Sequence, residues 1–550
     1  MMINIKFKKM NKLHIYILTL SSFAFIFSCT DVDEVLVGDI TTDVAVEGVS
    51  TGGSSGGSAD AVASAYSQLR STGTAGHTNW YSAQELTSDE MVVTTKGGDW
   101  YDGGWLIDFH QHNYQAVNPS VNNNWNSHYA AVNATNELIS GGTLDANGVA
   151  QVKALRAYYF WRLMDLYGNI KLPTTPGTDV AQGSALDAFN FIESELLSAI
   201  GVPAITAGMD LSQSALGTAP NTYRINIYGA LGILSWVYLN AETYGAAAHY
   251  QEAHDAADYI INNGGYELCG VGCKVANLGK RPAVAEDPAE LEGFAAVFAP
   301  NNNGNKEHIF VVNYDGEEGN TGMNLSVMSL HYSSQLTWNF DAQPWNGYST
   351  LEAFYNSFDA NDARQKASFI AGKQKNYNGG DVLDYATDDG DPILDYTPAI
   401  NEIYPDGLRQ AGARPGKFSY KQFGRIDMNN DFPIVRLGWV IMNRAEAAAR
   451  LGGGWSVSAA VLSDVNQIRN RANANPYASA AELTESEFLA ERGREFFGEA
   501  LRRTDLIRFD AYKNTWWEKT QVTPAYKNIM PIPFTAIQAA NGTLVQNPGY

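Results

Sequence analysis

The chain is poor in cysteine, histidine and basic residues. Its 550 residues include 3 cysteines, 9 histidines, and 37 lysines and arginines against 59 aspartates and glutamates. The resulting net charge of -22 argues against nucleic acid, whose phosphate backbone attracts a basic face, and against a basic patch on an anionic membrane. The zinc-protease motif H-E-x-x-H and the phosphate-binding P-loop are absent as well. Such a surface is a poor match for polyanionic ligands.

The apolar run near the amino terminus, residues 13–27, is too short to cross a bilayer in a mature protein. Four basic residues precede it: Lys6, Lys8, Lys9 and Lys12. It ends at Ser28 and Cys29, and a small residue before cysteine is where lipoprotein signal peptidase cuts. We therefore interpret residues 1–29 as a lipoprotein signal peptide ending at a lipidated Cys29. The alternative is an ordinary secretory peptide that has Cys29 nearby by chance.

The segment after Cys29 predicts a flexible tether. Residues 30–34 are acidic, and residues 51–58 consist almost entirely of Gly and Ser, a composition that behaves as a coil. We expect the tether to cover residues 30–58 and the fold to begin at residue 59.

The remaining cysteines, Cys269 and Cys273, lie in the short sequence Cys-Gly-Val-Gly-Cys. The two glycines let the loop close a disulfide, which an exported protein can form. Half of a metal site is the rival interpretation, but no second cysteine pair and no nearby histidine completes it. We favour a disulfide or two free thiols, and expect no metal.

The segment at residues 154–173 predicts a helix that is apolar on nearly every side, so other helices must bury it. Gly168 can adopt the left-handed conformation that ends the helix, and Pro173 prevents a restart. Further helices are predicted at residues 59–70, 122–138, 186–200, 224–244, 250–263, 435–451 and 459–472. The predicted scaffold is a stack of helix pairs similar to tetratricopeptide repeats, although no clean 34-residue period is present.

Residues 315–430 have a different character. A strand is predicted just before them, at residues 307–313, but long periodic runs are few and Gly, Asn, Asp and Tyr are frequent. Binding surfaces often lie in such loops on a rigid scaffold. Residues 384–391 could form a calcium loop, but their spacing is not that of an EF-hand, so we favour a solvated acidic loop.

The loop at residues 95–105 places four glycines around three large aromatic rings and two carboxylates. The rings are Trp100, Tyr101 and Trp105, and the carboxylates are Asp99 and Asp102. One interpretation is that the rings close the fold from outside. The other is a stacking surface for sugar rings, in which the aromatic faces contact C–H groups and the carboxylates accept hydroxyl hydrogens.

A charged segment follows near the carboxyl terminus. Thr484 and Glu487 form a capping-box pattern, and a long helix is predicted to follow it through residues 491–508. Its arginines and glutamates recur three and four residues apart, a spacing that favours ion pairs along the helix. We expect these groups to stabilise structure rather than to catalyse.

Together, several blocks resemble the SusD/RagB family, the surface nutrient-binding lipoproteins of Bacteroidota. The resemblance runs in the family's order from Ser28-Cys29 through residues 155–173, 343–364, 431–448, 491–508 and 530–533 to 546–550. Gly493, Gly498 and Ala500 depart from the pattern, since bulkier or polar residues are expected there. We expect these departures to loosen a helix contact.

The resemblance implies a mainly α fold, with a helix-pair region at residues 59–270 and a region with loop-rich α+β character and the binding loops at 271–550. It implies a non-catalytic glycan-binding protein without a cofactor, anchored to the outer membrane as a lid over a SusC-like TonB-dependent transporter. The acidity favours a neutral glycan. The implied ring contacts are Trp100, Tyr101, Trp105, Tyr332, Trp338 and Trp345, and the implied hydroxyl contacts are Asp99, Asp102, Asn339 and Asp341. For Trp345, a structural role is at least equally supported.

Three rival functions stay open. A glycoside hydrolase also needs aromatic rings and carboxylates, but it requires two carboxyl groups about 5–9.5 Å apart in a cleft. No block of this sequence matches a hydrolase signature. The other rivals are a peptide-binding protein of the same family and a cover for the transporter without a ligand of its own.

Overall fold

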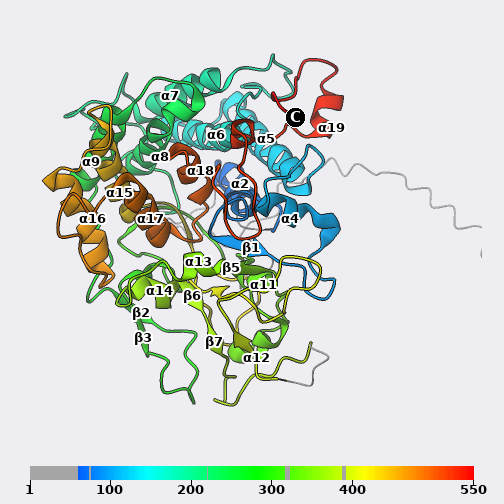
Figure 1. The fold of residues 1–550 in the computed structure, drawn as a ribbon. Coiled ribbons are helices and arrows are strands. Elements are labelled where there is room, and N and C mark those ends of the chain that lie inside the picture. Colours follow the sequence, from blue (N-terminus) through cyan, green and yellow to red (C-terminus); the bar gives the residue numbers. More distant parts are fainter. Residues whose placement is uncertain (1–59, 74–75, 220, 316–321, 387–391) are drawn as a thin grey trace, which may run out of the picture. The chain divides into compact units, whose positions relative to one another are not determined.

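The computed structural model describes residues 60–73, 76–219, 221–315, 322–386 and 392–550 (Figure 1). All of them belong to one compact unit, residues 60–550. The predicted signal peptide, the predicted lipidation site Cys29, the predicted tether and residues 387–391 of the acidic segment lie outside the described residues. The predicted boundary at residue 270 stays a prediction.

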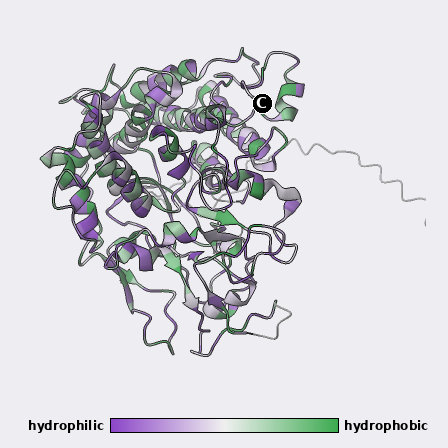
Figure 2. Ribbon diagram, viewed as in Figure 1, coloured by the Kyte–Doolittle hydropathy of each residue, from purple (hydrophilic) through white to green (hydrophobic). Residues whose placement is uncertain are grey.

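The helices of the described residues confirm the mainly α prediction, and most of them fall into two groups along the chain. The first group comprises α2 (Ala63–Thr72), α3 (Trp80–Glu85), α4 (Trp105–His110), α5 (Pro119–Ser140), α6 (Ala146–Tyr167), α7 (Ala185–Ile200), α8 (Ile227–Leu239) and α9 (Tyr250–Asn263). The second comprises α15 (Leu437–Arg450), α16 (Ala459–Arg471), α17 (Glu485–Phe496), α18 (Arg502–Arg508) and α19 (Phe534–Ala539). Neighbours in sequence pack on one another from α5 to α9, α9 packs on α15, and α15 packs on α16. Along α16 both hydrophilic and hydrophobic residues are visible, as expected for an outer helix (Figure 2).

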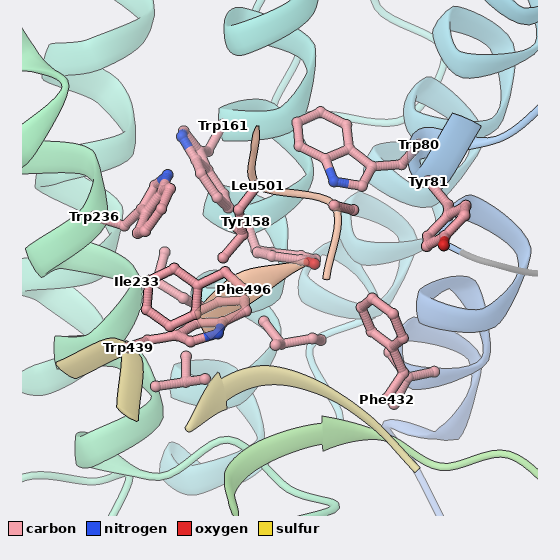
Figure 3. Packing of buried hydrophobic residues seen from close by; sticks show 14 of the residues in the cluster. Trp80, Tyr81, Tyr158, Trp161, Ile233, Trp236, Phe432, Trp439, Phe496 and Leu501 are labelled. Atoms are coloured by element: carbon pink, nitrogen blue, oxygen red, sulfur yellow. The ribbon is translucent and has the colours of Figure 1, made fainter. Parts of the chain in front are cut away.

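Helix α6 is buried over almost its whole length, as its sequence predicts. It begins earlier than expected because Asp145 caps it, accepting a hydrogen bond from the Gly148 N–H at 2.7 Å. It ends at Gly168, whose φ of 65° is positive, as expected for a glycine that ends a helix. Figure 3 shows Tyr158 and Trp161 of α6 in the same cluster as Trp236 of α8 and Trp439 of α15.

Helix α8 is buried on all sides and is shorter than the predicted 224–244. It begins after Asn226, which caps it, and a 3-10 turn, η2 (Ala241–Tyr244), follows its end. A Cβ on Gly232 would lie 2.3 Å from Val435, so this glycine lets α8 approach the strand before α15 closely.

Short strands join the helices to the loop-rich part of the unit. They are β1 (Met91–Val93), β2 (Lys274–Ala276), β3 (Glu290–Glu292), β4 (His308–Val312), β5 (Tyr348–Thr350), β6 (Phe369–Ile370), β7 (Gly372–Lys373), β8 (Asp395–Tyr396), β9 (Arg414–Pro415) and β10 (Phe432–Arg436). Within the described residues they form five antiparallel pairs, among them β1 with β5 and β4 with β10. The strand predicted at 307–313 is therefore confirmed, whereas its partner β10 was missed.

The charged segment is not one helix, so that prediction is wrong. Helix α17 ends at Phe496 and α18 begins at Arg502, and between them Gly498 and Ala500 have φ values of 71° and 60°. The buried Glu85 holds this break, accepting a hydrogen bond from the Ala500 N–H at 2.6 Å. Gly493, on α17, leaves room for Arg502, whose Nη1 would lie 2.9 Å from an added Cβ. These small residues permit close contacts rather than loosening them.

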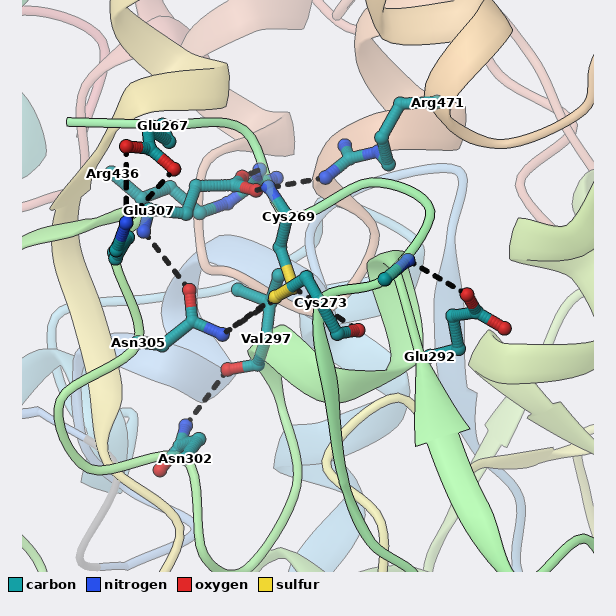
Figure 4. The surroundings of a disulfide bond; sticks show 12 residues. Glu267, Cys269, Cys273, Glu292, Val297, Asn302, Asn305, Glu307, Arg436 and Arg471 are labelled. Carbon is teal, nitrogen blue, oxygen red and sulfur yellow. Dashed lines mark hydrogen bonds and ion pairs between the residues drawn. A yellow bond between two sulfur atoms is a disulfide. The ribbon is translucent and has the colours of Figure 1, made fainter.

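Four charged residues of α17 are buried and paired: Glu491, Arg492, Arg494 and Glu495. Arg494 pairs with Glu491, three residues before it, at 2.8 Å, as the spacing predicts, whereas most of the other partners lie outside α17. Arg436 contacts Glu307 at 2.6 Å, Glu495 at 2.8 Å and Glu499 at 2.7 Å, and all four side chains are 0% exposed. We call this group the Arg436 cluster. A disulfide between Cys269 and Cys273 lies beside it, with Cα atoms 5.2 Å apart, and the Cys269 N–H donates to Glu307 at 3.0 Å (Figure 4).

The loop-rich part contains the remaining short helices, α10 (Phe294–Val297), α11 (Leu325–Ser329), α12 (Gln335–Trp338), α13 (Glu352–Tyr355) and α14 (Ala363–Ser368). The 3-10 turns are η1 (Asp102–Gly104), η3 (Tyr332–Ser334) and η4 (Ala525–Asn528). In Figure 1, α11 and α12 are separated from the α5–α9 stack and from α19. No helix in the described part of the chain combines the length and apolar character needed to cross a bilayer.

Candidate functional site

The loop at residues 95–105 is a tight, anchored turn. Gly97 and Gly98 have positive φ values, and Lys96 and Asp99 pair across the turn. The Lys96 ammonium is buried and donates to the Gly347 carbonyl at 2.7 Å, which fastens the loop to the segment before β5. Burial, together with nearby Arg414, lowers the pKa of Lys96. The glycines thus shape the turn while Lys96 fixes its position.

Two of the three rings of this loop are buried, which leaves little of either ring free to meet a ligand. Trp100 is 9% and Trp105 is 7% exposed. The Trp100 indole N–H donates to the Trp345 carbonyl at 2.5 Å, and its ring packs edge-on against Tyr348. A Cβ on Gly347 would lie 2.6 Å from the Trp100 ring, so this residue must be small. For these two tryptophans, burial favours the interpretation that the rings close the fold.

Other rings are exposed around the same loop. Tyr101 is 43% exposed, and its ring lies 5.3 Å from that of Tyr404, which is 52% exposed. Trp345 is 46% exposed, although its backbone is held through the Trp100 indole and through a bond from its own N–H to the Val327 carbonyl. Exposed rings on fixed backbone are suited to stacking, because little conformational freedom is lost when they bind.

A cleft of about 470 Å³ opens beside this loop. It is lined by Asp99, Tyr332, Ser333, Gln335, Leu336, Gln343, Tyr385, Ala386 and Arg409. The Tyr332 hydroxyl donates a hydrogen bond to the Asp99 carboxylate. Burial and the Asp99 charge raise the pKa of Tyr332, so this hydroxyl stays protonated at neutral pH. The cleft thus joins hydroxyl, amide, carboxylate and guanidinium groups with the 61% exposed ring of Tyr385.

Arg409 connects two loops at the cleft. Its guanidinium packs against Gly97, where an added Cβ would lie 2.1 Å from Nη2. Its carbonyl accepts hydrogen bonds from Asn346 at 3.0 Å and from the buried Arg414 at 2.7 Å. The Gly97 N–H in turn donates to Asp406 at 2.8 Å. The loops at 95–105 and 401–410 therefore form one wall.

Buried contacts hold the segments that carry several of the lining residues. His331, buried directly before Tyr332, lies 3.2 Å from the buried Asp384. The backbone N–H of His331 donates to the Tyr396 hydroxyl at 2.9 Å, and that hydroxyl also bonds with Ser334 at 2.6 Å. These contacts hold η3 and the segment before Tyr385, so the lining side chains project from fixed backbone.

The other predicted contacts do not line the cleft. Trp338 is half-buried, with its ring 4.9 Å from that of Tyr420, and lies at the far end of α12. Asn339 ends that helix with a φ of 50°. The Asp341 carboxylate accepts a bond from the Ile426 N–H at 3.1 Å. Asp102 is exposed in η1. The structure therefore brings Asp99 and Tyr332 together and places Trp338, Asn339 and Asp341 elsewhere.

Several lining residues were missed. Tyr385 and Arg409 belong to the segment that the sequence marks as binding loops, but no local pattern distinguishes them from their neighbours. Tyr385 lies within residues 384–391, for which the sequence favours a solvated acidic loop, and its place in that loop is the signal available there. Arg409 stands out only through contact with Gly97, which is distant in the chain.

The described lining of the cleft contains one carboxylate, that of Asp99. Across the described residues, no group of three or more His, Cys, Asp or Glu side chains is placed to hold a metal ion. The arrangement can accept and donate hydrogen bonds and stack rings.

Comparison with known proteins gives a consistent relationship. Residues 300–550 match the SusD family. The chain is 25% identical over 449 residues to the starch-binding protein SusD of Bacteroides thetaiotaomicron, covering 73% of this chain and 72% of that protein.

Solved structures share the fold. A SusD superfamily protein from Parabacteroides distasonis superposes with a TM-score of 0.66 at 17% identity, covering 89% of this chain and 98% of that one. Surface glycan-binding protein A from Bacteroides thetaiotaomicron, in complex with laminarihexaose, gives 0.63 at 18% identity, covering 88% and 98%.

Proposed function

The chain belongs to the SusD family, and from that premise we propose that it captures a neutral glycan without chemistry and delivers it to a SusC-like TonB-dependent transporter. The relatives named above are a starch-binding protein and a surface glycan-binding protein. The observation that carries the proposal is the cleft of Asp99, Tyr332, Tyr385 and Arg409 with exposed rings beside it.

The groups of the cleft fit a sugar. A sugar ring presents C–H faces that pack on aromatic rings and hydroxyl groups that both donate and accept hydrogen bonds. Tyr101, Tyr404, Trp345 and Tyr385 offer exposed rings, while Asp99 and the amides of Gln335 and Gln343 offer polar partners.

A neutral ligand fits the charges better than an anionic one. The described lining carries one cation, Arg409, and one carboxylate, Asp99. The chain as a whole has a net charge of -22, so long-range electrostatics would repel a polyanion. Arg409 can serve a neutral sugar through hydrogen bonds of its five N–H groups.

Affinity electrophoresis tests this proposal. Residues 60–550 would migrate through gels containing laminarin, soluble starch, xylan or pectin. We expect retardation by a neutral polysaccharide and no shortened products after incubation with it. Product formation would favour the hydrolase alternative. If no glycan retards the protein, peptide titrations separate the peptide-binding relative from a cover without a ligand.

A matched pair of variants locates the site. Trp345→Ala removes a 46% exposed ring beside the cleft, whereas Phe534→Ala removes a 51% exposed ring on α19. We expect about tenfold weaker glycan binding, or about 1.4 kcal/mol, for the first variant. The second should bind like the parent. If Trp345→Ala binds the glycan as tightly as Phe534→Ala does, Trp345 is not part of the site.

Membrane attachment is a separate part of the proposal. We propose that Cys29 carries lipid and holds the protein on the outer membrane, facing outward. Cys29→Ser should shift the full-length chain from the membrane fraction to the soluble fraction without changing glycan affinity. Membrane association that survives this change would contradict a lipid anchor.

A further inference from the structure

A second exposed aromatic surface lies beside α12. The rings of Tyr377 and Phe423 are 4.9 Å apart in an edge-on arrangement, and Phe423 is 66% exposed. We call these two residues the distal pair. Neither ring lines the cleft described above. The distal pair is therefore additional aromatic surface that the proposed site does not use.

Both members of the distal pair are fastened to α12. The Tyr377 N–H donates to the Leu336 carbonyl at 3.1 Å, and the Phe423 N–H donates to the Trp338 carbonyl at 2.8 Å. The side-chain amide of Gln422 donates to the carbonyls of Gly279 and Thr337, at 3.0 and 3.1 Å. These bonds fix the backbone of two loops that are distant in sequence, so the distal pair is held in place.

The same short helix joins the distal pair to the cleft. Gln335 and Leu336, at the start of α12, line the cleft, and Leu336 is 40% exposed. At a rise of 1.5 Å per residue, about 5 Å of helix separates Gln335 from Trp338. The exposed side chain of Leu336 lies on the segment that connects the two surfaces.

The backbone of Phe423 is in an unfavourable conformation. Its φ of 57° lies in the left-handed region, which bulky side chains rarely adopt. Burial of the ring does not compensate, since the side chain is 66% exposed. Strained residues that surrounding structure holds in place occur preferentially at ligand contacts. A ring held outward in this way is suited to stacking.

Polar groups accompany the distal pair. Asp341 is exposed, and its N–H donates to the Gly424 carbonyl at 3.3 Å, next to Phe423 in the chain. Asn339 ends α12 one residue after Trp338. Asn378, exposed, follows Tyr377. An aromatic pair with amide and carboxylate neighbours repeats the chemistry of the cleft.

We propose that the distal pair is a second contact site for the same polysaccharide chain, so that the protein selects long glycan chains over short fragments. The inference rests on the proposed glycan-binding function. One part of the chain occupies the cleft, and a later part of it crosses Leu336 and stacks on Tyr377 and Phe423. Because the two contacts are made by one molecule, the second is effectively intramolecular and raises affinity only for ligands long enough to reach it.

The test compares chain lengths in one variant. Tyr377→Ser with Phe423→Asn removes both rings, and asparagine tolerates the left-handed backbone. Affinity for the retained polysaccharide of the laminarin, starch, xylan and pectin panel, and for its trisaccharide, would be measured by gel retardation and calorimetry. We expect about tenfold weaker polysaccharide binding. Trisaccharide binding and the melting temperature should match those of the parent.

Phe534→Ser, which removes an exposed ring on α19, is the matched control and should change neither affinity. Unchanged polysaccharide affinity in the double variant overturns the inference while the proposed function stands. Equal losses for both ligands also overturn it, because they assign the distal pair to the cleft itself. A changed oligomeric state in sedimentation with unchanged affinity assigns the pair to a protein contact. Retention by no polysaccharide overturns the proposed function and the inference together.

Discussion

Two regions of this protein use the same residue types in opposite ways. In the Arg436 cluster, one arginine contacts Glu307, Glu495 and Glu499, and none of these side chains is exposed. In the cleft, Arg409 and Asp99 line an open space together with Tyr332 and the exposed ring of Tyr385. The first region satisfies its charges internally, whereas the second leaves polar groups and rings facing solvent.

The difference shows that burial, rather than residue type, decides what a charged cluster does. Charges removed from water need partners with good geometry, so the Arg436 cluster binds its segments together at defined positions. Segments from β4, β10 and α17 meet there, and the disulfide of Cys269 and Cys273 lies next to Glu307. The cleft instead leaves hydrogen-bonding groups facing its open space.

Breaking the buried cluster should have the largest effect. Arg436→Met leaves three buried carboxylates without their central partner, and such a loss costs about 3–5 kcal/mol of unfolding free energy. Urea denaturation of residues 60–550 would measure it. Lys306→Met, which removes the exposed ion pair with Glu267, is the control and should change stability little. A loss for Arg436→Met no larger than for the control would contradict a structural role for the cluster.

The next largest loss of stability should follow from removing a buried ring of the loop at residues 95–105. Trp100→Ala deletes a ring that packs on Tyr348 and whose indole N–H donates to the Trp345 carbonyl. Truncating a core tryptophan costs about 3–5 kcal/mol of unfolding free energy. Because this ring is 9% exposed, we expect a loss near the lower end of that range. Thermal melting measures the loss. Trp345→Ala is the comparison, since its exposed ring should matter little for stability. If Trp100→Ala melts like the parent, the ring is not part of the core.

The fold followed from sequence where local pattern and capping agreed. Helix α9 occupies the predicted residues 250–263, and α6 ends at Gly168 as expected, because both depend on periodicity and on one capping residue. The break between α17 and α18 could not be predicted in this way. It depends on Glu85, whose carboxylate accepts a hydrogen bond from the N–H of Ala500, 415 residues later in the chain.

The site was predicted only as a set of loops. Trp100 and Trp345 are both tryptophans in glycine-containing loops, yet one is 9% and the other 46% exposed. Which ring is covered depends on packing between segments 245 residues apart, where the Trp100 indole meets the Trp345 carbonyl. Composition could therefore indicate that rings gather in these loops, but it could not assign their exposure.

A smaller effect should appear as a pH dependence of stability. Burial raises the pKa of Glu85 from 4.5 to about 7, against the opposing hydrogen bond from Ala500. A carboxyl with a raised pKa in the folded state favours folding below pH 4.5, and this contribution is lost as the pH rises to about 7.

Glu85→Gln should therefore flatten the stability profile across that window, as measured by urea denaturation at several pH values. Glu267→Gln, at an exposed glutamate, is the matched control for the loss of one carboxyl charge. A Glu85→Gln profile that keeps the slope of the parent through this window would contradict a raised pKa at Glu85.

The smallest effect should come from the exposed pair Tyr101 and Tyr404, whose rings lie 5.3 Å apart. Each single change to alanine should weaken glycan binding about threefold, or about 0.6 kcal/mol, and leave the melting temperature unchanged. The double variant supplies a cycle, because two rings that hold one sugar together should show a non-additive loss. Additive losses would mean that the rings act separately, and lower melting temperatures would place this pair with Trp100 as part of the fold rather than with the ligand surface.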